Sequence, residues 1–116
     1  MIQQELLYAI KGPILILGAG GFIGRNLWEA LKKRDDVFAL CSPRGPGRLS
    51  PDTKNVIITD ALDFEKLKGI IRRIAPQTIF NLISYGNYHF QTDPELISRT
   101  NWGLPYQLLQ WCQDYP

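Results

Sequence analysis

The chain has 116 residues, which is enough for one compact domain with a core of its own. Hydrophobic residues make up 45% of it and charged residues 21%, as in ordinary globular domains, and no apolar run is long enough to cross a membrane. The formal net charge is only +2, and basic residues are followed by acidic ones, as at residues 32–36. This charge distribution argues against a nucleic-acid partner.

The two cysteines, Cys41 and Cys112, lie far apart and have no C-x-x-C spacing. With His89 as the only histidine, they are too few to form a zinc site, and they do not make the framework of a disulfide-rich secreted domain. We therefore expect reduced thiols, a cytoplasmic location and no bound metal.

Residues 1–12 lack the basic start and the long apolar centre of a signal peptide. They are interpreted as an N-terminal extension, either a short amphipathic helix or an added segment that leads into the first strand. A single domain is then expected over residues 13–116.

Residues 13–18, PILILG, are apolar and end in glycine, which predicts a buried strand. From Phe22 the apolar residues recur at helical spacing, and the basic residues 32–34 suit the end of a helix. Residues 37–41 and 55–59 predict a second and a third strand, separated by a loop rich in proline and glycine.

A second helix is predicted to begin after Asp63, which can cap it, and to end before Pro76; residues 77–83 then predict a fourth strand. Asp93 and Pro94 are typical of a helix start, and the last helix is expected over residues 94–112. Because Pro105 has no N–H to donate to the carbonyl of Asn101, we expect a bend there.

Apolar strands joined by long crossovers predict an α/β fold, with a parallel sheet of about four strands and helices on both faces. Right-handed crossovers and a glycine-rich turn after the first strand favour the Rossmann-type strand order third, second, first, fourth.

The turn between the first strand and the first helix contains four glycines in the seven residues from Gly18 to Gly24. Gly18 can make a tight turn, Gly21 can let a pyrophosphate touch the backbone, and Gly24 can let the helix lie close to the strand. The spacing is G-x-x-G-x-x-G; Ile23 excludes the G-x-G-x-x-G form, and no phosphate loop of the GxxxxGK[ST] kind is present. The alternative is a turn that serves strand–helix packing alone.

With these elements in order, the chain resembles the extended short-chain dehydrogenase/reductases, the NAD-dependent epimerase/dehydratase family. The resemblance covers residues 14 to about 112. It rests on LGAGGFIG (residues 17–24), DALD (60–63), FNLIS (80–84), the Asp93-Pro94 pair and NWGLPYQLLQWC (101–112). Leu17 departs from the threonine that is usual in the family's loop.

The resemblance implies a cofactor site for NADP or NAD at the carboxyl ends of the strands. Asp60 would meet the adenine; the alternative is that its side chain only stabilises a turn or caps a helix. Asn101 would orient a water, fix a loop or satisfy the backbone at the helix bend. The residues expected at the cofactor are Gly18, Gly20, Gly21, Phe22, Ile23, Gly24, Ser42, Arg44, Asp60, Ala61, Leu82, Ile83, Ser84 and Asn101.

NAD-binding proteins of this fold carry an acidic residue at the end of the second strand, for the ribose hydroxyls. Here the strand ends in Cys41, followed by Ser42, Pro43 and Arg44. Arg44, with Arg48 nearby, could pair with a 2′-phosphate, which slightly favours NADP. Solvated arginines on a loop are the alternative.

The family's catalytic Tyr-x-x-x-Lys pair is absent, since no tyrosine here has a lysine four residues later. We therefore expect no catalytic residues in this chain, which would be the inactive N-terminal part of an oxidoreductase acting on a nucleotide sugar. The alternatives are a non-catalytic NAD(P)-binding sensor or scaffold, and a structural protein that has lost its nucleotide. The chain could form a homodimer through the edge of the fourth strand or through the last helix, which carries Leu104, Leu108, Trp111 and Cys112. The alternative is that these four side chains pack in the core.

Overall fold

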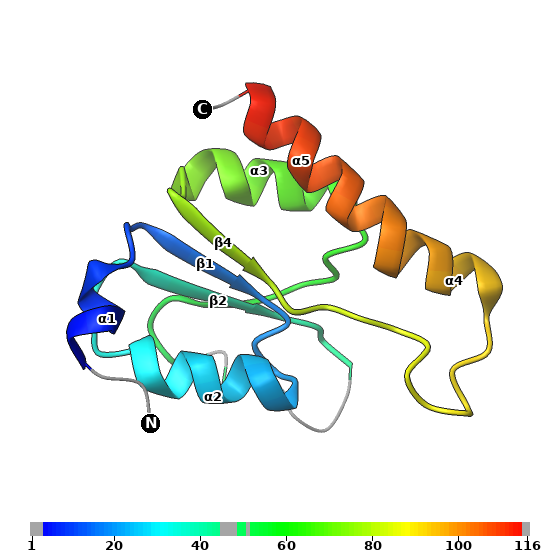
Figure 1. The fold of residues 1–116 in the computed structure, drawn as a ribbon, viewed down its shortest axis with the longest axis horizontal. Helices are drawn as coiled ribbons and strands as arrows, with labels where there is room; N and C mark the ends of the chain where they lie inside the picture. The colour runs from blue at the N-terminus through cyan, green and yellow to red at the C-terminus, as the bar shows by residue number, and fades with distance from the viewer. Residues whose placement is uncertain (1–3, 45–48, 51, 115–116) are drawn as a thin grey trace.

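The computed structural model describes residues 4–44, 49–50 and 52–114. Four strands form one sheet, with helices on both of its faces (Figure 1). In chain order the elements are α1 (Gln4–Ala9), β1 (Ile14–Leu17), α2 (Phe22–Leu31), β2 (Val37–Cys41), β3 (Val56–Ile58), α3 (Phe64–Ile74), β4 (Thr78–Asn81), α4 (Pro94–Ser98), the π-helical segment η1 (Arg99–Gly103) and α5 (Leu104–Asp114).

The sheet has the order β3-β2-β1-β4, and each pair of neighbours is parallel. Ile14 at the start of β1 pairs with Val37 and Thr78, which begin the strands on either side. All strand starts therefore lie at one edge, and all carboxyl ends lie at the other. This confirms the predicted fold class and strand order.

Alternate residues of β1 point to opposite faces of the sheet, because successive side chains of a strand alternate. All four residues of β1 are fully buried, which explains its continuous apolar sequence. One core cluster joins Ile14 and Ile16 to Trp28 and Leu31 of α2, and the other joins Leu15 and Leu17 to residues of α3 and α5. In Figure 1, α1 and α2 accordingly lie on one face, and α3 and α5 on the other.

The helix starts predicted at Asp63 and Asp93 are confirmed. The Asp63 carboxylate accepts from the backbone N–H of Lys66, and that of Asp93 accepts from Glu95 and Leu96. Each carboxylate satisfies N–H groups that have no partner within the helix.

The last helical stretch runs from Pro94 to Asp114 and widens into a π turn at η1. The N–H of Leu104 donates to the carbonyl of Arg99, five residues earlier. A bend is expected at Asn101; what the structure has there is a widened π turn, which accommodates Pro105 without ending the helix.

Leu104, Leu108 and Trp111 of this stretch are at most 7% exposed and pack against β1 and α3. Of the two roles open to these three side chains, packing in the core is therefore confirmed, and they do not form an association surface. Cys112 beside them is exposed.

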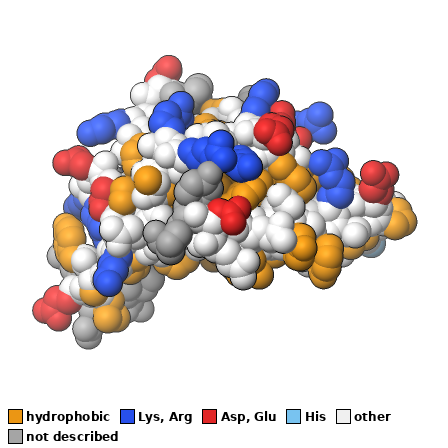
Figure 2. All heavy atoms as spheres, turned by 90° about the horizontal axis from the view of Figure 1, so that it is seen from above, with side chains coloured by type: hydrophobic (Ala, Val, Ile, Leu, Met, Phe, Trp, Pro, Cys, Tyr) orange, Lys and Arg blue, Asp and Glu red, His pale blue; other side chains and the backbone are white. Residues whose placement is uncertain are grey.

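The surface over α3 and α5 carries basic and acidic side chains interspersed with apolar ones (Figure 2). Within the described residues no helix is long and apolar enough to span a bilayer. The same part of the chain contains no cluster of three or more His, Cys, Asp or Glu side chains placed to hold a metal ion.

Candidate functional site at the glycine loop

The glycine loop begins where β1 ends, at the carboxyl edge of the sheet. Gly18 has φ +82°, a conformation that residues with a side chain rarely adopt, and a Cβ there would lie 2.9 Å from the carbonyl of Leu82. The backbone N–H groups of Gly18 and Ala19 both donate to the carbonyl of Leu40, at 3.1 Å. The loop is therefore fixed between the ends of β2 and β4.

Gly24 lies in the first turn of α2, where the helix passes over the loop. A Cβ at this position would come within 2.0 Å of the carbonyl oxygen of Gly18, a backbone atom that cannot move aside cheaply. Gly24 thus allows the close packing of helix and strand that its spacing predicts.

Gly21 differs from these two glycines. The nearest atom to a Cβ there would be the carbonyl oxygen of Gly18, at the ordinary contact distance of 3.5 Å. Its φ of −76° and ψ of 175° are open to any residue. Neither packing nor backbone conformation therefore requires glycine at this position. A ligand that approaches the backbone closely would require it, because a side chain would be in the way.

The first turn of α2 presents the backbone N–H groups of Phe22, Ile23 and Gly24, which lie too early in the helix to have a partner within it. The N-cap residue Gly21 has no side chain to accept from them, whereas Asp63 and Asp93 cap α3 and α4. These N–H groups and the helix dipole favour an anion at this end of α2. The side chains of Phe22 and Ile23 are 86% and 66% exposed beside it.

Two predicted residues follow β2 at the same edge. The Ser42 hydroxyl accepts from the backbone N–H of Arg44 at 3.1 Å, and both residues are exposed. Arg48, the second candidate for a 2′-phosphate, lies outside the described residues.

After β3, the backbone turns at Asp60. One carboxylate oxygen of Asp60 accepts from the N–H of Leu62 at 2.9 Å, so this side chain stabilises the turn, as in the alternative interpretation. Asp60 is nevertheless exposed. Within the described residues, its second carboxylate oxygen accepts no hydrogen bond, so it could accept one from a ligand. Ala61, also predicted at the cofactor, is only 6% exposed and packs in the core.

The segment after β4 forms the wall next to the glycine loop. The N–H of Leu82 donates to the carbonyl of Leu17 at 2.9 Å, and Ile83 packs in the core on the α3 side. Ser84 is exposed, and its hydroxyl accepts from the side-chain amide of Asn87. Leu82 and Ile83 are therefore the predicted residues that the fold brings directly against Gly18.

Asn101 fixes a loop, one of the roles considered for it. Its amide oxygen accepts from the N–H of Tyr85 at 3.0 Å, and its amide nitrogen donates to the carbonyl of the same residue. Both bonds join η1 to the segment after β4, so Asn101 holds that segment in place.

Arg99 was not among the predicted residues. Its guanidinium donates to the carbonyl of Leu62 at 2.9 Å and lies 5.6 Å from the ring centroid of Phe64. It thereby ties η1 to the turn that carries Asp60. Its place two residues before Asn101 was the only signal in the sequence.

The protein-family model described as the NAD dependent epimerase/dehydratase family matches residues 14–116. Among solved structures, the chain is similar to L-threonine 3-dehydrogenase from Trypanosoma brucei, with a TM-score of 0.77 and 23% identity over 91% of this chain and 34% of that one. It is also similar to the enzyme WbmG from Bordetella bronchiseptica in complex with NAD and UDP (TM-score 0.68, 17% identity, 87% of this chain and 33% of that one). A short chain dehydrogenase from Leptospira borgpetersenii with bound NAD+ matches with a TM-score of 0.59 and 16% identity, over 96% of this chain and 48% of that one.

These structural likenesses, all below 25% identity, show the fold. The chain spans about a third of the length of the L-threonine 3-dehydrogenase and WbmG structures, at 34% and 33%. A search of curated proteins finds no match.

Proposed function

Because this chain belongs to the NAD dependent epimerase/dehydratase family, we propose that its glycine loop binds the pyrophosphate of a nicotinamide dinucleotide. The observation that carries the proposal is Gly21, a glycine that neither packing nor conformation requires, at the uncapped start of α2. The residues present fit the group: the N–H groups of residues 22–24 would hold the pyrophosphate, and Asp60 would accept from the adenine amino group. When bound, the cofactor supplies hydride transfer.

Replacing Gly21 with aspartate tests this proposal with little risk to the fold. Aspartate is a favoured N-cap residue, so Gly21→Asp should preserve or improve the stability of α2. Its carboxylate would accept hydrogen bonds from the N–H groups that the pyrophosphate needs, and its negative charge would repel the phosphates.

The measurement is a titration of the 116-residue chain with NADH and NADPH, followed by nicotinamide fluorescence. We expect Gly21→Asp to weaken binding at least about 30-fold, as for the loss of charge-assisted hydrogen bonds. Gly69→Asp is the matched control, because Gly69 lies exposed on α3 with no atom within 4 Å of its missing Cβ. Equal affinity of the two variants for the dinucleotide would contradict the proposal.

We propose that NADP is slightly preferred over NAD, because β2 ends without an acidic residue and Arg44 follows it. Two of the similar solved structures hold NAD, so the preference of this chain has to be measured. Arg44→Ala in the same titration should weaken NADPH binding and leave NADH binding unchanged. A chain that binds NADH more tightly than NADPH would contradict the preference.

For the whole protein we propose an oxidoreductase of the epimerase/dehydratase type, acting in the cytoplasm on a nucleotide sugar. The UDP in the WbmG structure and the free thiols of Cys41 and Cys112 support this proposal. The residues that would donate and accept protons are expected outside this chain, which would be inactive alone. A Tyr-x-x-x-Lys motif within about 60 residues after Pro116 would support an enzyme, whereas a stop codon there would favour the NAD(P)-binding sensor or scaffold.

A further inference from the structure

The N-terminal helix α1 lies outside the residues that the family model matches, which begin at Ile14. It has only six residues, and an isolated helix of this length does not persist in water. Contacts with the rest of the domain must therefore hold it in place.

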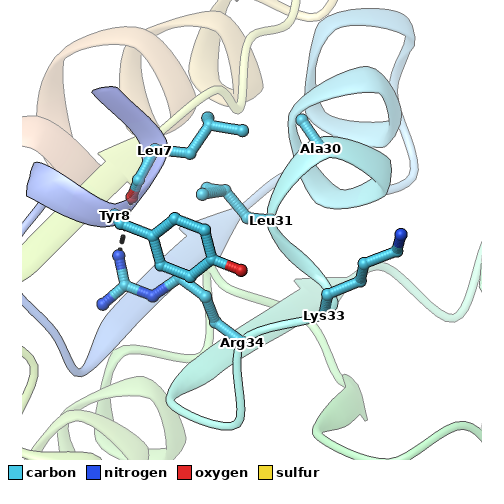
Figure 3. Close-up of a pocket in the computed structure, with 6 residues that line it drawn as sticks. All are labelled: Leu7, Tyr8, Ala30, Leu31, Lys33 and Arg34. Atoms are coloured by element: carbon cyan, nitrogen blue, oxygen red, sulfur yellow. Dashed lines mark hydrogen bonds between the residues drawn. The ribbon is translucent and has the colours of Figure 1, made fainter. Parts of the chain in front are cut away.

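Arg34, in the turn before β2, makes hydrogen bonds that hold this segment. One guanidinium nitrogen donates to the carbonyls of both Leu7 and Ile10, at 2.8 Å each, and two further nitrogens donate to the carboxylate of Asp36 at 2.9 and 2.8 Å. Figure 3 shows the guanidinium directly below the end of α1, with the bond to the Leu7 carbonyl drawn as a dashed line. Carbonyls at the end of a helix lack partners within it, so Arg34 caps α1.

The side chain of Arg34 is only 13% exposed, and Asp36 gives it a carboxylate in a two-point geometry. This pairing lowers the pKa of Asp36 below its ordinary value, chiefly through the side-chain hydrogen bond from Arg34, and raises that of Arg34. The pair is therefore charged, and it holds the cation against the end of α1.

Gly12 completes the attachment. A Cβ at this position would lie 1.7 Å from the Asp36 carboxylate oxygen, so the chain can pass this close to the ion pair only with glycine. On either side of Gly12, the hydroxyl of Thr78 donates to the carbonyl of Lys11, and the N–H of Gln77 donates to that of Pro13. The segment is thus bound to the starts of both β2 and β4.

Leu7 adds an apolar contact. It is 9% exposed and belongs to the same core cluster as Ile14, Trp28 and Leu31. Burial of this apolar side chain is favourable, so residues 4–12 extend the core as well as lying on it.

We propose that residues 4–12 are a strap that closes the amino-terminal edge of the sheet, and that the Arg34–Asp36 pair is the latch that holds it. The folded domain therefore includes α1 and does not start at β1. Opening the latch frees the strap and exposes the Lys11–Gly12 peptide bond, while the sheet stays folded.

Limited digestion of the 116-residue chain with trypsin tests the proposal, because Lys11 precedes the only peptide bond before Arg25 that trypsin can cut. The variants are Arg34→Lys, which keeps the charge but loses the fork of donors, and Gly12→Ala, which displaces the carboxylate. Arg73→Lys, on the exposed side of α3, is the matched control. Cleavage after Lys66 and Lys68 in α3 reports on global unfolding in the same digest.

We expect both latch variants to speed cleavage after Lys11 about tenfold or more, with cleavage in α3 and the control variant unchanged. An acceleration below threefold would overturn the proposal. So would an equal acceleration at Lys11 and in α3, since the strap would then open only with the whole domain. If Arg34→Lys does not fold, the digest of Gly12→Ala and hydrogen exchange at the Ala9 amide of the unmodified chain test the proposal. Exchange at Ala9 as fast as in an unfolded peptide would overturn the proposal.

Discussion

Gly24 and Gly21 lie three residues apart, and the structure requires glycine only at Gly24. A Cβ at Gly24 would be 2.0 Å from the Gly18 carbonyl oxygen, whereas one at Gly21 would meet that oxygen at 3.5 Å. We therefore expect Gly24→Ala to lower the free energy of unfolding by about 2–3 kcal/mol, since the helix must shift away from the loop. Gly21→Ser should change it by less than about 1 kcal/mol, because serine is a good N-cap.

Urea unfolding of both variants checks this difference. Equal loss of stability at the two positions would contradict the conclusion that packing requires glycine at Gly24 and not at Gly21. A Gly24→Ala variant with an unchanged free energy of unfolding would show that α2 can move away from β1 at little cost.

Asp36 makes the attachment of α1 depend on pH. Its pKa in the folded chain is lowered, so the carboxylate contributes stability that is fully present above its ordinary pKa of about 3.9 and is lost as the pH falls through the lowered value. We expect α1 to loosen below about pH 4 and Asp36→Asn to abolish this acid response.

The methyl signals of Leu7, followed by NMR between pH 6 and pH 2.5, report on the position of α1. Because Asp36 is 41% exposed, solvent screens part of the interaction and the loosening should be gradual. An Asp36→Asn variant with the acid response of the unmodified chain would assign that response to another group.

The hydrogen bonds of η1 hold the loop that follows β4. Asn101 both donates to and accepts from the backbone of Tyr85, and the side-chain oxygen of Gln91 accepts from Gly86 and Tyr88 further along. Asn101→Ala should speed hydrogen exchange at the Tyr85 amide about tenfold and leave the amides of β1 protected. Asn101→Asp retains the acceptor and should have the smaller effect, so the reverse order would contradict this account.

The long elements could be predicted from the sequence, because burial on both faces makes β1 apolar throughout and the capping aspartates precede α3 and α4. The strand ends could not: residues 55–59 and 77–83 shorten to Val56–Ile58 and Thr78–Asn81. A strand ends where its partner stops pairing, which depends on register and not on local composition. Pro105 predicted a bend at Asn101, whereas the helix widens there into a π turn, a form that the proline alone does not specify.

In the candidate site, the tight turn at Gly18 and the close packing at Gly24 follow from the spacing, because the backbone itself makes the turn, whereas the ligand role of Gly21 stays a prediction. The contacts of Arg99 and Arg34 could not be predicted, because each long side chain reaches a carbonyl that is distant in the sequence, at Leu62 and Leu7. Whether Ser42, Arg44, Asp60 and Ser84 touch a cofactor stays a prediction.

The molecule as a whole has two sheet edges, β3 and β4, and an edge strand is a template for pairing. The exposed side of η1 and α5 adds Trp102, Tyr106 and Leu109, which are 67%, 45% and 68% exposed, and residues 100–113 carry no charged side chain. We expect the 116-residue chain to self-associate, and Leu109→Glu to weaken that association if this side is the interface.

Light scattering across a range of concentrations measures the association. Leu6→Glu, on the exposed side of α1, is the matched control because Leu6 is 61% exposed and lies on a different helix. A monomer at every concentration would exclude a homodimer of this chain. Association unchanged by Leu109→Glu would place the interface at a sheet edge instead.

The most direct measurement of the central claim is the response of the backbone amide signals to NADPH and NADH, in ¹⁵N NMR of the 116-residue chain. If the loop binds the pyrophosphate, the amides of Gly21, Phe22, Ile23 and Gly24 will shift most, followed by those near Asp60 and Ser84, and Gly21→Asp will abolish the shifts. If saturating dinucleotide leaves these amides unmoved, or shifts a different surface while the loop stays still, the glycine loop of this chain is a packing turn and not a cofactor site.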